Sequence, residues 1–302
     1  MDPLQLSNCS FGFDVAFCDK LSPALAMHSH AFHEMVYVFS GRGKHITEHG
    51  TYDMEPGGLF IVRPGALHAY ADRSHVKLVN IMFDLNRLPY PTELLRMDPA
   101  FRAFFDFGQE LDDKFLYRNR LVLLDEDRQR MEKLLYEIRS EYVAQRIGRQ
   151  ACLIALLTEL FIHIARVCGS KRYTVTRNLI LLERISTFLK KNPDHPLTIP
   201  ELAKRYGLSQ KSLERLFQDS MQCTPNAYCI KLRLEKAIPL LMDSSYSITE
   251  IAYLCGFYDS SYFSKMFRKK FGISPRDFQR NHKHPHPYAP SEPHGEEEEG
   301  FF

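Results

Sequence analysis

The sequence lacks the features that mark several classes of protein. Its seven cysteines are scattered and form no C-x-x-C pair, so we expect reduced thiols rather than a disulfide framework. The N-terminal stretch has no basic segment followed by an apolar one, so we expect no signal peptide. The longest apolar run, residues 151–168, is interrupted by Glu159, His163 and Arg166, which is wrong for a membrane span. We expect a cytoplasmic protein without a membrane partner.

The chain is long enough for about two domains and has the composition of a protein that buries a core. It has 302 residues, of which 44% are hydrophobic and 25% are charged. These values exclude collagen-like, mucin-like and wholly disordered chains.

The small net charge of +2 hides a strong asymmetry. Residues 171–284 hold 20 Lys and Arg against 10 Asp and Glu. Residues 1–170 are mildly acidic, and residues 285–302 contain five glutamates and no Lys or Arg. The asymmetry predicts a polyanionic partner for the basic segment only.

The N-terminal half changes from a strand pattern to a helix pattern. Between Phe11 and Phe83, short β-branched or aromatic runs such as EMVYVF and GLFIVR alternate with Gly and Pro turns, which is typical of a barrel or sandwich. After Pro91 the period becomes helical, with apolar residues at Met131, Leu134, Leu135, Ile138 and Tyr142. Gly148 is expected to end this helix, and residues 151–167 form a second helix that is apolar enough to need cover on nearly all sides.

Two segments of the basic half, 197–221 and 246–272, share one design. Each has a Ser or Thr cap, a short helix, a Gly-containing turn (Gly207 or Gly256) and a capped helix of about a dozen residues. This is the helix-turn-helix plan, whose second helix enters the major groove of DNA. A connecting helix at 226–242 would set the two recognition helices about one helical turn of DNA apart, roughly 34 Å. The basic segment is therefore predicted to bind double-stranded DNA.

The run SITEIAYLCGFYDSSYFSKMFRKKFGISPRDFQR (247–280) resembles the signature of the AraC/XylS family of bacterial transcription regulators. LSQKSLERLF (208–217) resembles the first recognition helix of that family, and the match extends over about 183–281. The resemblance implies a promoter-binding regulator, usually an activator, that acts at the bacterial nucleoid and is not an enzyme.

Helical spacing separates core residues from candidate DNA readers. Leu213, Leu216 and Phe217 should face the core in the first recognition helix, as should Phe263, Met266, Phe267 and Phe271 in the second. The first helix leaves its polar side chains for base edges: Gln210, Lys211, Glu214, Arg215 and Gln218. The second leaves a reading face and a phosphate-binding end: Ser260, Ser261, Tyr262, Ser264 and Lys265, then Arg268, Lys269 and Lys270.

Two carboxylates stand inside the otherwise basic second unit. Asp259 begins a helix and Glu250 lies three residues after Ser247, so both have the positions of helix-capping residues. The resemblance to sugar-responsive activators implies a second role, as contacts for the sigma subunit of RNA polymerase.

The N-terminal half holds a histidine-rich constellation. His28-x-His30-x3-Glu34-x6-Gly41 resembles the first motif of the cupin barrel, with Ser22 where that motif has glycine. Gly58-x5-Pro64-Gly65-x2-His68 approximates the second motif, with the histidine one residue early. If one strand carries His28, His30, Phe32 and Glu34, their side chains point into one cavity.

Three interpretations of this cavity stay open. His28, His30, Glu34 and His68 are plausible metal ligands. The same residues with Phe32 and Tyr70 could bind a small polar effector, or they could be internally satisfied polar residues. The resemblance to the sugar-sensing, rhamnose-responsive branch favours a sugar effector without a cofactor. The alternative function is a metal-dependent cupin enzyme, an isomerase or dioxygenase, fused to a DNA-binding domain.

The sequence thus predicts an α+β fold in five segments. They are a cupin-like effector-binding β-barrel (1–90), a helical segment for homodimerisation (91–170), a linker (171–182), an all-α domain with two helix-turn-helix units (183–281) and a disordered tail (282–302). Alternating His282, His284 and His286 in the tail could collect a transition metal adventitiously.

Overall fold

The structure of the protein is a computed structural model that describes residues 12–18, 25–88, 92–107, 111, 115, 120–144, 146–195, 198–243 and 245–283. These residues fall into two compact units. The first takes in the described residues up to Phe188 together with Ile199–Pro225, and the second takes in Leu189–Thr198 and the described residues from Asn226 onward. The division runs through 183–281, which the sequence predicts to be one domain. Apart from 282 and 283, the predicted tail lies outside the described residues.

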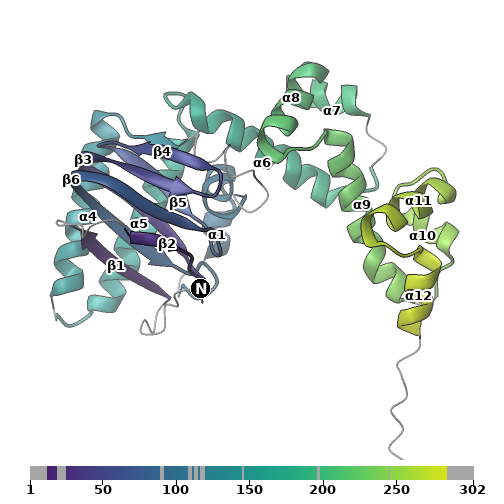
Figure 1. The fold of residues 1–302 in the computed structure, drawn as a ribbon, viewed down its shortest axis with the longest axis horizontal. Helices are drawn as coiled ribbons and strands as arrows, with labels where there is room; N and C mark the ends of the chain where they lie inside the picture. The colour runs from purple at the N-terminus through teal and green to yellow at the C-terminus, as the bar shows by residue number, and fades with distance from the viewer. Residues whose placement is uncertain are drawn as a thin grey trace, which may run out of the picture. The chain divides into compact units, whose positions relative to one another are not determined.

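The first unit contains a seven-stranded antiparallel sheet (Figure 1). Its order is β1-β6-β3-β5-β7, with β2 on β6 and β4 on β3. The strands are β1 (Phe13–Cys18), β2 (Leu25–His28), β3 (His33–Thr47), β4 (Gly50–Met54), β5 (Gly58–Val62), β6 (His68–Phe83) and β7 (Leu121–Val122). The α+β class is confirmed, but over the described strands the sheet does not close into the predicted barrel.

Both faces of the long strands β3 and β6 are buried. Met35 and Tyr37 of β3 lie on the face that packs against helices, whereas Val36 and Val38 lie on the opposite face among other strands. We call this second face the inner face; its buried residues include Met54, Phe60, Val62, Tyr70 and Leu78. Burial on both sides explains why EMVYVF is almost continuously hydrophobic.

Two helices, α4 (Asp125–Val143) and α5 (Arg149–Gly169), cover the other face of the sheet. The predicted amphipathic spacing is confirmed, because Met131, Leu134, Leu135 and Ile138 of α4 are all buried. Gly148, with a φ of 79°, separates the two helices as expected. By length and composition α5 could cross a membrane, but half of its most apolar stretch is buried in this core.

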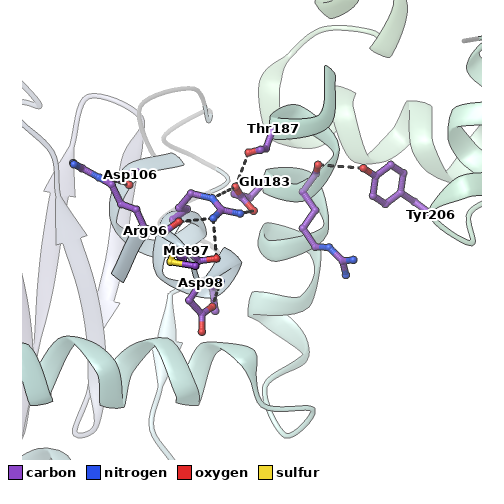
Figure 2. A network of polar contacts seen from close by, with 10 residues as sticks. Arg96, Met97, Asp98, Asp106, Glu183, Thr187 and Tyr206 are labelled. Atoms are coloured by element: carbon purple, nitrogen blue, oxygen red, sulfur yellow. Dashed lines mark hydrogen bonds and ion pairs between the residues drawn. The ribbon is translucent and has the colours of Figure 1, made fainter. Parts of the chain in front are cut away.

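A buried ion pair links the sheet-bearing part of the first unit to α6 (Thr174–Lys191). Short helices α1 (Thr92–Arg96) and α2 (Pro99–Phe101) lead into a π-helical turn, η1 (Arg102–Asp106). The Nε of Arg102 lies 2.6 Å from Oε1 of Glu183, which is 1% exposed. Thr187 also donates to Glu183, at 2.7 Å (Figure 2). Because α6 begins at Thr174, most of the predicted linker, 171–182, is helix, and its side chains Leu179 and Leu182 are buried.

The remaining helices form the two predicted helix-turn-helix units and their connection. They are α7 (Ile199–Arg205) and α8 (Gln210–Met221), the connecting α9 (Pro225–Met242), then α10 (Ile248–Leu254), α11 (Ser260–Phe271) and α12 (Pro275–Lys283). Gly207 and Gly256 stand in the two turns with φ of 68° and 82°, a conformation that side chains with a Cβ rarely adopt. Because α8 and α11 belong to different compact units, their predicted separation stays a prediction.

Candidate functional site

The recognition helix of the first unit, α8, presents the face that its spacing predicts. Ser209 caps the helix by accepting a hydrogen bond from the backbone N–H of Ser212, at 3.1 Å. Leu213, Leu216 and Phe217 are buried. All five candidate readers are exposed: Gln210, Lys211, Glu214, Arg215 and Gln218. Gln210 donates to Glu214 at 2.9 Å, so these two side chains hold each other within the face.

The second recognition helix, α11, also separates core from surface. Phe263 and Phe267 are buried, whereas Met266 and Phe271 are only partly buried against the same core. Most of the candidate readers are exposed, and Ser260 and Ser264 are half-buried. Tyr262 is 43% exposed, and the nearby Tyr258 is 77% exposed, an aromatic side chain that the spacing argument did not single out.

The basic end of α11 is less uniform than the sequence suggests. Arg268, Lys269 and Lys270 are all exposed in the last turn. The Nζ of Lys270 lies 3.0 Å from Oε1 of Glu235 on α9, so Lys270 already has a carboxylate partner. The pair joins residues 35 positions apart, and no local pattern in the sequence signals it.

The two carboxylates of the second unit cap helices. Asp259 accepts hydrogen bonds from the backbone N–H groups of Ser261 and Tyr262, at 2.8 and 3.2 Å. Glu250 and Ser247 form a complete capping box at the start of α10. The pKa of the exposed Glu250 is lowered, chiefly because its carboxylate accepts the backbone N–H of Ser247. The predicted capping roles are confirmed.

The histidine constellation of the sheet converges on Glu34, although not on one strand. β2 ends at His28 and β3 begins at His33, so His30 and Phe32 lie in the connection, and the predicted shared strand is wrong. His30 still reaches Glu34 from four residues away, with Nε2 3.0 Å from Oε2. β6 brings His68 to the same oxygen, at 3.2 Å.

The rest of the cluster closes around the same carboxylate. Tyr70 donates to Glu34 Oε1 at 3.4 Å, and Asn80, which the sequence argument missed, donates to the same oxygen. The rings of His28 and His68 lie 4.3 Å apart, and Phe32 stacks on His30 at 4.3 Å. The structure thus brings together all six predicted effector residues: His28, His30, Phe32, Glu34, His68 and Tyr70.

Charge within the cluster follows from its burial and its partners. Burial by itself raises the pKa of the Glu34 carboxyl, but the imidazoles of His30 and His68 outweigh burial and lower this pKa to about 2. His45, which stacks on Tyr70 at 5.3 Å, is a further member that the motif argument missed. Burial lowers the pKa of His45 to about 3, and the nearby His68 adds to the effect. At neutral pH Glu34 is therefore ionised and His45 is neutral.

A cavity of about 420 Å³ lies beside this cluster's strands, at β3 and β4. Charged side chains dominate its lining: Arg42, Gly43, Lys44, Asp53, Met54, Glu55, Asp72 and Arg120. Met54 belongs to the inner core together with Val36 and Tyr70, so the cavity borders the inner face of the sheet. Sequence motifs did not identify it, because its lining comes from separate strands and from Arg120.

Each half of the chain matches a known domain family. Residues 21–160 match the profile of the AraC-like ligand binding domain, and residues 202–281 match that of a helix-turn-helix domain. Among curated proteins, the chain is 27% identical over 258 residues to the HTH-type transcriptional activator RhaS of Yersinia pseudotuberculosis, covering 85% of this chain and 89% of that protein. It is 29% identical to RhaS of Salmonella schwarzengrund, over 85% and 88% of the two chains.

Among solved structures, an AraC-type DNA-binding domain protein from Chromobacterium violaceum is 33% identical, with a TM-score of 0.33, and covers 35% of this chain and 94% of its own. The two profiles match in order over most of the chain, and the two capped recognition helices lie where the helix-turn-helix profile matches. The protein belongs to the AraC family and is a DNA-binding transcription regulator.

Proposed function

We propose that the protein is an effector-responsive activator that reads promoter DNA with α8 and α11. The observation that carries this proposal is the pair of capped recognition helices, each with a buried apolar face and an exposed face of basic, amide and hydroxyl side chains. The relatives it resembles over most of its length are named activators, which supports activation rather than repression. The action takes place in the bacterial cytoplasm, at the nucleoid.

Arg215 is the best candidate for a base contact on α8. Its guanidinium is exposed, and no partner for it is found among the described residues. Arginine can donate two hydrogen bonds to guanine O6 and N7, which discriminates one base pair from the others. Gln210 and Glu214 are already hydrogen-bonded to each other, so they are less free than Arg215 to contact a base.

The effector is a small polyol or sugar that binds on the inner face of the sheet. The cavity beside β3 and β4 has the size of a small-molecule site, and the charged groups around it can hydrogen-bond hydroxyl groups. Tyr70 and the Glu34 cluster border the same face and offer aromatic and polar contacts. The domain binds its ligand and does not convert it.

Activation involves two further protein contacts. Exposed apolar side chains on α4, including Tyr136 at 55% and Val143 at 72%, support a homodimer built through α4 and α5. Asp259 and Glu250 are exposed at the ends of α11 and α10, which supports a contact with the sigma subunit of RNA polymerase beyond their capping roles.

The test of DNA reading uses a duplex selected from random sequence by the full-length protein. Arg215→Ala should cost about 1–3 kcal/mol of binding free energy on the selected duplex and relax the preference at one base pair. On a random duplex the loss should be much smaller. An equal loss on both duplexes would remove Arg215 from the base readers.

The test of sensing is a thermal-shift screen of sugars and polyols against the full chain. A ligand that binds only the folded protein raises its melting temperature by mass action. The charge-altering variant Arg42→Gln in the cavity should lower that shift while leaving DNA binding intact. If no sugar shifts the melting temperature, the proposed effector class is wrong, and DNA reading is unaffected by that result.

A further inference from the structure

A second cavity lies among helices, where α4 and α5 meet the segment that leads into α6. Its volume is about 410 Å³, which is the size of a small-molecule site. Three guanidinium groups line it: Arg130 of α4, Arg166 of α5 and Arg172 of the segment between α5 and α6. It shares no lining residue with the cavity at β3 and β4, so it is not part of the proposed sugar site.

The lining of this cavity carries one carboxylate, and that carboxylate is held by other groups. Oδ2 of Asp127 accepts a hydrogen bond from the hydroxyl of Tyr173 at 2.7 Å and lies 3.1 Å from the guanidinium of Arg172. The side chain of Asp127 is only 13% exposed, so these contacts leave it little room for another partner. Asp127 therefore balances one of the three positive charges in the lining, and two remain.

The other partners of the three arginines lie outside the cavity and are exposed. Arg166 is exposed, and its guanidinium has no partner among the described residues. Arg130 pairs with Glu159 at 2.7 Å, and both side chains are about half exposed. Glu126, which pairs with Arg172 at 3.2 Å, is 85% exposed, and neither glutamate lines the cavity. Exposed ion pairs contribute little to stability, so an anion inside the cavity can take the place of both glutamates.

The cavity also offers uncharged contacts. Ser170 follows Arg166 by four residues, the spacing that places two side chains on one helix face. Its Oγ accepts the backbone N–H of Arg172 at 3.3 Å, which leaves the hydroxyl proton for a ligand oxygen. The buried side chains of His163 and Val167 complete this side of the lining. A ligand can therefore have an organic part beside its charged group.

We propose that this cavity binds a phosphate monoester of a small polar molecule, as a second ligand site of the regulator. A phosphate monoester carries a charge of about −1.5 to −2 at neutral pH and three strong acceptor oxygens, which match the positive charge left in the lining. Guanidinium groups donate two parallel hydrogen bonds to phosphate oxygens, which favours arginine at phosphate sites. A volume of about 410 Å³ exceeds what a phosphate group fills, so the organic part has room beside His163 and Val167.

A ligand in this cavity would join three elements of the first unit. Thr176, near the start of α6, donates to the carbonyl of Cys168 at the end of α5, at 2.6 Å, so α6 already starts from this corner. An anion bound to all three arginines would also connect α4 and α5 to the residues just before α6. Its binding is therefore expected to stabilise the first unit, whichever effector the inner face of the sheet binds.

The experiment is a calorimetric titration of the full-length protein, in a buffer without phosphate, with glycerol 3-phosphate, ribose 5-phosphate, glucose 6-phosphate and inorganic phosphate. We expect one site per chain for at least one ester and weaker binding of inorganic phosphate. Arg166→Gln should weaken binding of the ester about 10-fold or more, the loss that one charged hydrogen bond causes. Arg184→Gln is the matched control and should bind like the wild type, because Arg184 is exposed on α6 and does not line the cavity.

Three further variants locate the site. Arg130→Gln should weaken binding of the ester as Arg166→Gln does, and thermal melting checks that both variants fold. Arg215→Gln on α8 and Arg42→Gln in the cavity at β3 and β4 should retain wild-type affinity for the ester. Loss of binding in either of these two would assign the ester to the DNA-reading face or to the sugar cavity, and would overturn the proposal.

The ligand class is tested by the same titrations. Absence of binding by all the esters at millimolar concentration would overturn the proposal. Inorganic phosphate that binds as tightly as the esters would do so too, because the organic part would then make no contact. A sugar screen without a hit would leave the phosphate site standing, so the two ligand proposals fail separately.

Discussion

At the scale of single residues, helical period predicts exposure well and predicts partners poorly. The period places Arg215 on the surface and Phe217 in the core, because a helix repeats its faces every 3.6 residues. The pairing of Lys270 with Glu235 depends on how α9 packs against α11. No local pattern encodes that packing, so the sequence treated Lys269 and Lys270 as equivalent.

In the structure these two lysines differ, because only Lys270 is paired with Glu235. Lys269→Gln should flatten the dependence of log K on log salt by about 0.9 for a random duplex, the value for one lost phosphate contact. Lys270→Gln should change the slope by less than half as much, because its ammonium is paired with Glu235. Fluorescence anisotropy between 50 and 200 mM salt measures both, at roughly the ionic strengths where such slopes are large. Equal changes in slope would show that the pair opens on DNA.

His163 on α5 should make stability sensitive to mild acid. Burial lowers its pKa in the folded state, and the Asp127 carbonyl, 3.1 Å from Nε2, only partly offsets this. Below about pH 6.5 the unfolded chain binds the proton more readily, so stability is lost as the pH falls. His163→Gln should reduce the fall in melting temperature between pH 7 and 5, and the part that remains belongs to other buried histidines such as His45.

At the scale of elements, the sequence predicts the strands and helices but not how a motif is distributed over them. Residues 28–34 read as one inward-facing strand. The structure divides them between β2, a connection and β3, because β2 pairs with the start of β6, where His28 lies opposite His68, whereas β3 begins opposite Phe83 at the end of β6. The cluster forms nevertheless, since His30 and Glu34 are four residues apart and β6 supplies His68.

The bend of β3 against β6 depends on Gly41. Its φ is 83°, and an added Cβ would lie 2.4 Å from the carbonyl oxygen of His75 on β6. Gly41→Ala should therefore lower the melting temperature by more than conformational strain alone, which costs about 1–2 kcal/mol. Gly65→Ala is the matched control, with a φ of 80° and no atom within 4 Å. Similar losses in the two variants would show that the clash relaxes.

Capping and activation can be separated at the start of α11. Asp259→Asn keeps an acceptor for the N–H groups of Ser261 and Tyr262, so the melting temperature should stay near that of the wild type. Asp259→Ala should instead cost about 1 kcal/mol of stability. If Asp259 contacts sigma, Asp259→Asn loses transcription activation while DNA affinity is retained. Normal activation by both Asp259→Asn and Glu250→Gln would limit the carboxylates to capping.

At the scale of the whole molecule, the contact between Arg102 and Glu183 ties the sheet-bearing part of the first unit to α6. Because Glu183 is 1% exposed, Arg102→Met leaves a buried carboxylate without its cation and should cost about 3 kcal/mol. The double variant with Glu183→Gln should recover part of this loss. Arg96→Gln, in the half-exposed pair with Asp106, should cost less than about 1 kcal/mol. Thermal melting of the three variants and the wild type measures these differences.

The division of the chain into two compact units also changes how its affinity for DNA arises. α8 lies in one unit and α11 in the other. Under the function proposed above, each helix therefore contacts its half-site as part of a separate unit. Once one unit is bound, the other meets its half-site at a high local concentration, and such avidity can raise affinity roughly 10²–10⁴-fold without a new contact. The gain depends on both half-sites facing the protein together. Half a turn of DNA inserted between them should abolish it, and a full turn should restore part of it.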